Sequence, residues 1–179
     1  SNNRLPATTQ YVGIGALEGY IEVLPTYGDI AYATGKGVQI LANHFLGSRF
    51  TILGATAIST WGLFLFATGP SADPGTKTTG WMAAQLGSGM LWSSCGRIFV
   101  NWVDFNGRGR LLAAVFGIGT DGGGGVATLG FSYLSPISWR LPFFISGGFF
   151  ATIGGLCLGF LRGTSVKAGF RAPYESTSL

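Results

Sequence analysis

The sequence predicts an all-α fold, a polytopic bundle of about five transmembrane helices, and three observations carry that prediction. Of 179 residues, only 10% are charged, whereas a soluble domain has about 25%. Hydrophobic residues make up 47% of the chain and aromatic residues 14%. Three stretches, residues 50–72, 122–139 and 141–161, contain no charged side chain. Since about 20 apolar residues cross the hydrocarbon core of a bilayer, each of these stretches is long enough to span or nearly span it.

The formal charge of +4 does not indicate nucleic acid binding. The 11 basic residues form no run and mark the ends of apolar segments, which is typical of membrane topology. Cys95 and Cys157 lie inside apolar segments without metal-ligand spacing, so we expect neither a disulfide framework nor a zinc site. The chain has one histidine, no Ser/His/Asp arrangement and no paired carboxylates, so we do not expect an enzyme.

We divide the chain into three parts by polarity. Residues 1–27 form a polar N-terminal segment, residues 28–163 the transmembrane bundle, and residues 164–179 a polar tail. Within the first part, residues 11–24 have apolar side chains at helical spacing, which predicts a helix lying in the membrane interface.

The bundle is expected to contain five helices, and the sequence features that predict them differ from one helix to the next. The expected helices cover residues 30–46, 50–68, 80–103, 111–134 and 141–161. The first carries a lysine and a histidine, so one side of it would have to face protein or water. The second is the clearest, because the turn-rich stretch GPSADPGTK follows it. Tryptophans near both ends of the third are typical interfacial anchors.

Alternating loops place the basic residues unequally on the two sides of this bundle. One side carries Arg49, Arg108, Arg110, Arg162, Lys167 and Arg171, and the other carries Arg4, Lys77 and Arg140. The richer side is expected to be cytoplasmic, stromal or matrix.

Glycine, with 31 residues, recurs at GxxxG spacing in the apolar segments. Small residues let membrane helices approach closely, so Gly119 with Gly123 and Gly155 with Gly159 are predicted helix-packing positions. The string GIGTDG also matches the dinucleotide fingerprint, but it lacks the strand and helix that the fingerprint requires, so we reject that interpretation.

Three charged residues fall inside the expected spans: Lys36, Arg97 and Asp121. A carboxylate in mid-membrane costs about 2.5–3.5 kcal/mol, so Asp121 needs a partner, and Arg97 on the preceding helix is the candidate. The group is either a substrate or proton site or, as we favour, a structural ion pair.

His44, Asn43 and Gln39 are the candidate pigment or metal ligands, because they place donor atoms on an apolar helix. A lone histidine more often forms a hydrogen bond at a helix end, and this alternative is favoured. No second ligand residue supports a metal site made by the protein alone.

Residues 28–163 resemble the N-terminal half of a major facilitator superfamily transporter, in the sugar-phosphate and glycerol-3-phosphate exchanger branch. The strings GDIAYATGKGVQ, GSGMLWSSCGRIFVNWVDFNGRGR and SWRLPFFISG carry the resemblance, being similar to the second helix, the fourth helix with its loop, and the start of the sixth. The resemblance implies a helical half-transporter, with Lys36, Arg97 and Asp121 facing a central cavity.

The chain departs from this family at its gate. Aligning on Lys36 places Ile40, His44, Phe45 and Arg49 where the family has its gating clamp, so only the last basic residue remains. Residues 1–27 contain no apolar counterpart of the first helix, and a second six-helix half is missing, although transporters of this kind rock one half against the other.

We therefore expect a non-catalytic accessory subunit, docked through glycine-rich faces to other integral membrane subunits and to lipid. The start at Ser1 and the isolated half-fold favour an organellar complex: a thylakoid photosystem with its antenna first, a mitochondrial inner-membrane complex second. No cofactor is required, although the thylakoid hypothesis would bring chlorophyll and carotenoid together with lipid. The alternative is an organophosphate or sugar-phosphate carrier, acting as a fragment or a half-size transporter.

Overall fold

The computed structural model describes residues 7–69, 73–102, 109–110, 113–115 and 123–160, and their regular structure is entirely α-helical. Side chains are described from residue 23 onward, except for those of residues 101, 102 and 124. The described helices are α1 (Ala7–Phe45), α2 (Ser48–Thr68), α3 (Pro74–Trp102), α5 (Gly123–Leu134) and α6 (Leu141–Phe160). The all-α prediction is confirmed for this part of the chain.

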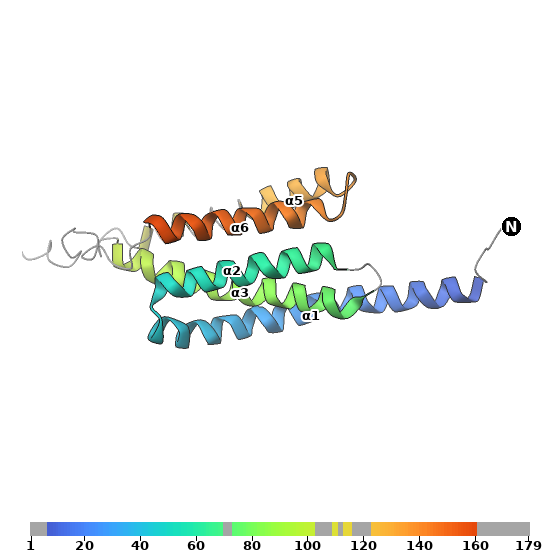
Figure 1. The fold of residues 1–179 in the computed structure, drawn as a ribbon, viewed down its shortest axis with the longest axis horizontal. Helices are drawn as coiled ribbons and strands as arrows, with labels where there is room; N and C mark the ends of the chain where they lie inside the picture. Colours follow the sequence, from blue (N-terminus) through green and yellow to red (C-terminus); the bar gives the residue numbers. More distant parts are fainter. Residues whose placement is uncertain (1–6, 70–72, 103–108, 111–112, 116–122, 161–179) are drawn as a thin grey trace, which may run out of the picture.

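The four long helices lie side by side in the order α1, α3, α2, α6, as Figure 1 shows. Helix α3 packs against α1 on one side and α2 on the other, and α6 packs on the far side of α2. Helix α5 contacts α6, close to the turn that joins the two. The N-terminal part of α1 extends beyond the ends of the other helices. Among the described helices, α1 and α6 thus lie at the two edges of this row.

Helices α2 and α6 start and end within two residues of the predicted spans 50–68 and 141–161. Both are long and apolar enough to cross a membrane, with 21 and 20 residues. The apolar part of α5, Gly125–Leu134, is shorter than a span. The described residues therefore contain two candidate spans rather than the expected five, because α1 and α3 are long but carry more polar residues and α5 is only partly described.

Helix α1 differs from the expectation, because it joins the predicted interfacial helix and the predicted first span into one helix of 39 residues. The boundary at residue 27 lies inside it, and so does Pro25. Proline has no backbone N–H, so one intrahelical hydrogen bond is missing there, and the helix nevertheless continues. At 1.5 Å per residue, α1 is about 58 Å long.

Helix α3 begins at Pro74, six residues before the predicted start at residue 80. The reason lies in the stretch interpreted as a turn. Asp73 Oδ1 accepts a hydrogen bond from Gly75 N at 3.1 Å, and Oδ2 accepts one from the Thr76 hydroxyl. Asp before Pro is a strong helix start, since Asp caps the free N–H groups and Pro suits the first helical position.

Close contact between helices is made by small residues on both sides of α3. A methyl group added at Gly35 of α1 would lie 2.2 Å from Leu86 O, and one at Gly89 would lie 2.2 Å from Tyr32 O. On the other side, a methyl group at Gly62 would lie 2.4 Å from Ala84 N. Backbones therefore touch across both interfaces, which is how membrane helices associate where apolar burial provides little driving force.

Candidate functional site

Two of the three residues predicted as a substrate site, Lys36 and Arg97, lie within the described structure, on different helices. Lys36 is exposed on α1, with Nζ 4.6 Å from the centre of the Tyr32 ring, and Arg97 is exposed on α3. Asp121 lies outside the described residues. The buried pair of Arg97 and Asp121 therefore stays a prediction, and Arg97 is not itself buried.

Gln39 and Asn43, two of the predicted ligands, are buried where α1 packs against α3, with exposed fractions of 6% and 4%. The Ser94 hydroxyl lies 3.3 Å from Asn43 Oδ1, while Asn43 Nδ2 has no hydrogen-bond partner among the described residues. His44, in the last turn of α1, is exposed and stands edge-on to Phe45, with ring centres 5.0 Å apart. Of the three, His44 is the one that an external pigment could reach.

Three of the four predicted packing glycines lie away from the helix contacts that the described residues make. Gly119 is outside the described residues. Gly123, Gly155 and Gly159 are exposed, and a methyl group added at any of them would have no atom within 4 Å. The neighbouring Gly154 is the buried one, facing Thr56 of α2. Gly155 and Gly159 therefore pack against none of the described residues.

Aromatic and basic side chains gather at the end of the bundle where α2 ends and α3 and α6 begin. This aromatic–basic cluster consists of Phe66, Lys77, Trp81, Trp139, Arg140 and Phe143. Lys77 Nζ lies 4.0 Å from the centre of the Trp139 ring, and Arg140 Cζ lies 5.3 Å from it. Phe66 packs against Phe143 with ring centres 4.6 Å apart. The cluster joins residues more than 60 positions apart in sequence, so helical spacing alone could not reveal it.

Lys77 is the buried charge of this cluster, with 9% of its surface exposed. Burial lowers the pKa of its amine, and the neighbouring cation Arg140 lowers that pKa further. The nearest carboxylate in sequence, Asp73, is occupied by the cap of α3. Among the described residues, the charged group that acts on Lys77 is therefore a second cation.

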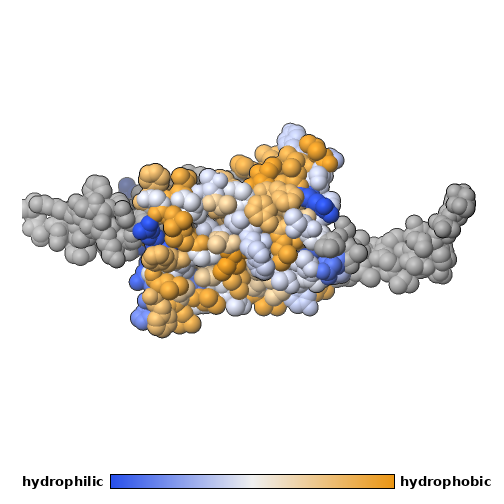
Figure 2. Space-filling model, in the orientation of Figure 1, coloured by the Kyte–Doolittle hydropathy of each residue, from blue (hydrophilic) through white to orange (hydrophobic). Residues whose placement is uncertain are grey.

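Basic residues also mark the opposite end of the bundle. Arg49, in the first turn of α2, donates a hydrogen bond through Nη2 to Leu158 O in the last turn of α6. This satisfies one of the carbonyls that a helix C-terminus leaves free. Lys77 and Arg140 at one end and Arg49 at the other follow the predicted alternation. Figure 2 shows hydrophilic residues toward both ends of the viewed face and hydrophobic ones between them.

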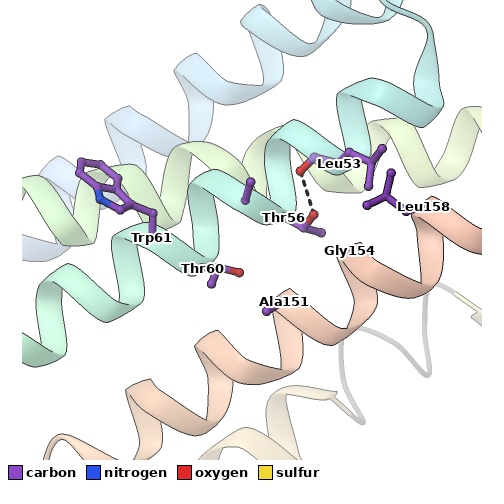
Figure 3. A pocket seen from close by; sticks show the side chains of 8 residues that line it. Leu53, Thr56, Thr60, Trp61, Ala151, Gly154 and Leu158 are labelled. Atoms are coloured by element: carbon purple, nitrogen blue, oxygen red, sulfur yellow. Dashed lines mark hydrogen bonds between the residues drawn. The ribbon is translucent and has the colours of Figure 1, made fainter.

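Two of the cavities that the described residues form lie along the row of helices. One, of about 470 Å³, lies between α2 and α6 and is lined mainly by apolar groups; Figure 3 shows Thr60 and Ala151 facing into it from the two helices. The other, of about 330 Å³, is lined by residues of α2, α3, α5 and α6, among them Trp81 and Phe143 of the aromatic–basic cluster. Neither cavity is lined by the described residues of the predicted ligand and substrate sites, which are Lys36, Gln39, Asn43, His44 and Arg97.

Comparison with known proteins identifies no relative of this chain. No protein-family model, no curated protein and no solved structure matches the chain.

Proposed function

We propose that this chain is a non-catalytic integral membrane subunit that docks to other membrane proteins of a larger complex. The observation that carries the proposal is the exposure of α6. Its sequence is apolar enough to cross a membrane, yet only three of its 20 residues, Pro142, Gly147 and Gly154, are buried within the chain. A helix so apolar and so little covered needs lipid or protein around it.

The outer face of α6 is formed by one continuous stripe. The stripe consists of four residues that are between 52% and 82% exposed and follow one another at spacings of four, seven and four: Ile145, Phe149, Leu156 and Phe160. Gly155 and Gly159 border this stripe and have open space beside them. Large apolar residues next to a GxxxG pair suit the close approach of another transmembrane helix.

Two exposed cations support docking to protein rather than to lipid alone. Lys36 and Arg97 lie within expected spans and have exposed side chains. Charged groups at bilayer depth almost always face protein or a water-filled cavity. A neighbouring subunit would supply that environment.

The arrangement of about five spans belongs to this proposal. Helices α1 and α3 and residues 111–134 would cross the bilayer beside α2 and α6. The glycine contacts of α3 with both neighbours allow a less apolar helix to occupy the centre of the row. A photosystem–antenna complex of a thylakoid is the first assembly to search for, and a mitochondrial complex the second.

The experiment is extraction of the source membrane with mild detergent, followed by a native gel. We expect the chain in a large assembly. Gly155→Leu combined with Gly159→Leu should release it, because two bulky side chains would block close approach. Gly54→Leu is the matched control, since Gly54 is exposed on α2 with nothing within 4 Å. A chain that migrates alone, or is released equally by the control, contradicts the proposal.

The alternative is the organophosphate carrier, which requires Lys36, Arg97 and Asp121 to share a water-filled cavity. Neither described cavity is lined by Lys36 or Arg97. Liposomes holding the purified chain should therefore show no exchange of sugar phosphate against phosphate. Exchange that Lys36→Ala abolishes would replace the subunit proposal with the carrier.

A further inference from the structure

The aromatic–basic cluster lies where two candidate spans meet the membrane surface. Phe66 is two residues from the C-terminal end of α2, and Trp139 and Arg140 directly precede α6. If α2 and α6 cross the bilayer, these residues lie at headgroup depth, where tryptophan is enriched. The inference below depends on that part of the proposed function and on no particular parent complex.

Among the residues whose side chains are described, the charge at this place is unbalanced. Lys77 is 9% exposed and Arg140 only partly exposed, and both lie against the same Trp139 ring. The carboxylate of Asp73 is held by Gly75 and Thr76 at the start of α3. Two cations that lie against the same ring, one of them removed from water, are stabilised by an anion that contacts both.

An apolar cavity adjoins the two cations. The cavity of about 330 Å³ shares Trp81 and Phe143 with the cluster. Phe131 and Phe150 continue its wall, and Gln85 and Ser88 add polar groups from α3. A ligand that fits both features has an anionic head and an apolar tail.

We propose that the aromatic–basic cluster binds the headgroup of an anionic glycerolipid, with an acyl chain in the adjoining cavity. Lys77 and Arg140 neutralise the headgroup charge, and the Trp139 ring packs against both cations. The acyl chain contacts Phe131, Phe143 and Phe150. The bound lipid fills a gap among α2, α3, α5 and α6 and joins helices that contact one another only in part.

The test uses the purified full chain in detergent. It is titrated with phosphatidylglycerol and, separately, with phosphatidylcholine carrying the same acyl chains, and bound lipid is counted by native mass spectrometry. Each basic residue at a membrane surface contributes about fivefold in affinity, so the wild type should prefer phosphatidylglycerol by about 25-fold. Lys77→Gln with Arg140→Gln should abolish this preference, whereas Lys77→Arg should keep it.

Arg110→Gln is the control, since it removes an exposed cation outside the cluster. Equal affinity for the two lipids in the wild type overturns the lipid site, as does an equal loss of preference in the control. Displacement of the lipid by an excess of inorganic phosphate overturns it too, because the site would then bind a free anion. Circular dichroism checks that each variant keeps its helices.

Flotation with phosphatidylcholine vesicles separates this inference from the proposed function. A wild-type chain that does not float with the vesicles contradicts membrane insertion, and with it both proposals. A chain that floats but shows no lipid preference contradicts the lipid site alone.

Discussion

At the scale of single residues, the polar contact between α1 and α3 depends on which acceptor receives the proton of the Ser94 hydroxyl. Ser94 Oγ lies 2.9 Å from Met90 O and 3.3 Å from Asn43 Oδ1, but a hydroxyl can donate only once. If it donates to Met90 O, its oxygen is free to accept, and an Asn43 carboxamide turned to place its NH₂ group there would supply the donor. That orientation pairs the otherwise unpartnered amide nitrogen.

This arrangement predicts a modest coupling between Asn43 and Ser94. In a double-mutant cycle of Asn43→Ala and Ser94→Ala, we expect a coupling free energy of about 0.6 kcal/mol, the average for hydrogen bonds between membrane helices. Unfolding by sodium dodecyl sulfate in mixed micelles measures it. Strict additivity of the two substitutions would show that the two side chains form no stabilising bond.

The Asp73 carboxylate, which caps α3, should make the stability of the protein depend on pH in the acid range. The hydrogen bond from Thr76 lowers the pKa of this carboxyl below its usual 3.8. Its cap therefore contributes stability fully above pH 3.8, and that contribution is lost as the pH falls through the lowered folded value. The thermal midpoint in detergent should thus fall more steeply at acid pH for the wild type than for Asp73→Asn, because asparagine caps a helix without titrating. If the thermal midpoints of the two proteins fell in parallel with pH, the Asp73 cap would not be the source of the acid sensitivity.

At the scale of helices, two glycines on α1 give opposite predictions. Gly35 faces the backbone of Leu86, whereas Gly37, one half-turn away, has nothing within 4 Å. Gly35→Ala should therefore destabilise the fold by about 1–3 kcal/mol through overpacking. Gly37→Ala should stabilise it by up to about 1 kcal/mol, since alanine favours the helix. Unfolding in mixed micelles compares them, and a similar loss for both would place Gly37 against a partner as well.

The helices differ in how well the sequence predicts them, for physical reasons. Residues 50–68 and 141–161 are uninterrupted apolar runs bounded by turn residues, so α2 and α6 could be predicted to within two residues. Helix α1, which contains Pro25, was predicted in two pieces because residues 1–27 are polar and residues 30–46 are apolar enough for a span. Whether a helix continues past one missing hydrogen bond depends on what packs around it, which a local pattern does not contain.

The site residues were harder to predict than the helices. GxxxG spacing pointed to Gly155 and Gly159, whereas the close contacts use Gly35, Gly62 and Gly89. The spacing of small residues shows that a helix can pack closely but not which neighbour it meets. A search for any two small residues four apart would have found Gly80 with Ala84 on α3. The contact of Lys77 with Trp139 depends on the order of helices in the row, so no local pattern could predict it.

At the scale of the whole molecule, the row of helices places α6 at one edge (Figure 1), and the large apolar side chains of its outer face are exposed. Two environments could cover such a face: water, if the chain were soluble, or the interior of a membrane. They predict opposite effects of a charge. Phe149 lies near the middle of α6 and is 65% exposed, so a lysine there would be harmless in water.

In a bilayer, that lysine at the helix centre would cost about 2.5–3.5 kcal/mol. We therefore expect Phe149→Lys to reduce insertion of α6 by about 100-fold in a glycosylation assay with microsomes. Ile137→Lys is the matched control, because Ile137 is exposed and apolar too but lies in the turn before α6, at the depth where charge is tolerated. Equal insertion of the two variants would mean that α6 does not cross the membrane. A selective loss for Phe149→Lys would place the open edge of the row in the bilayer, where a partner helix can reach it.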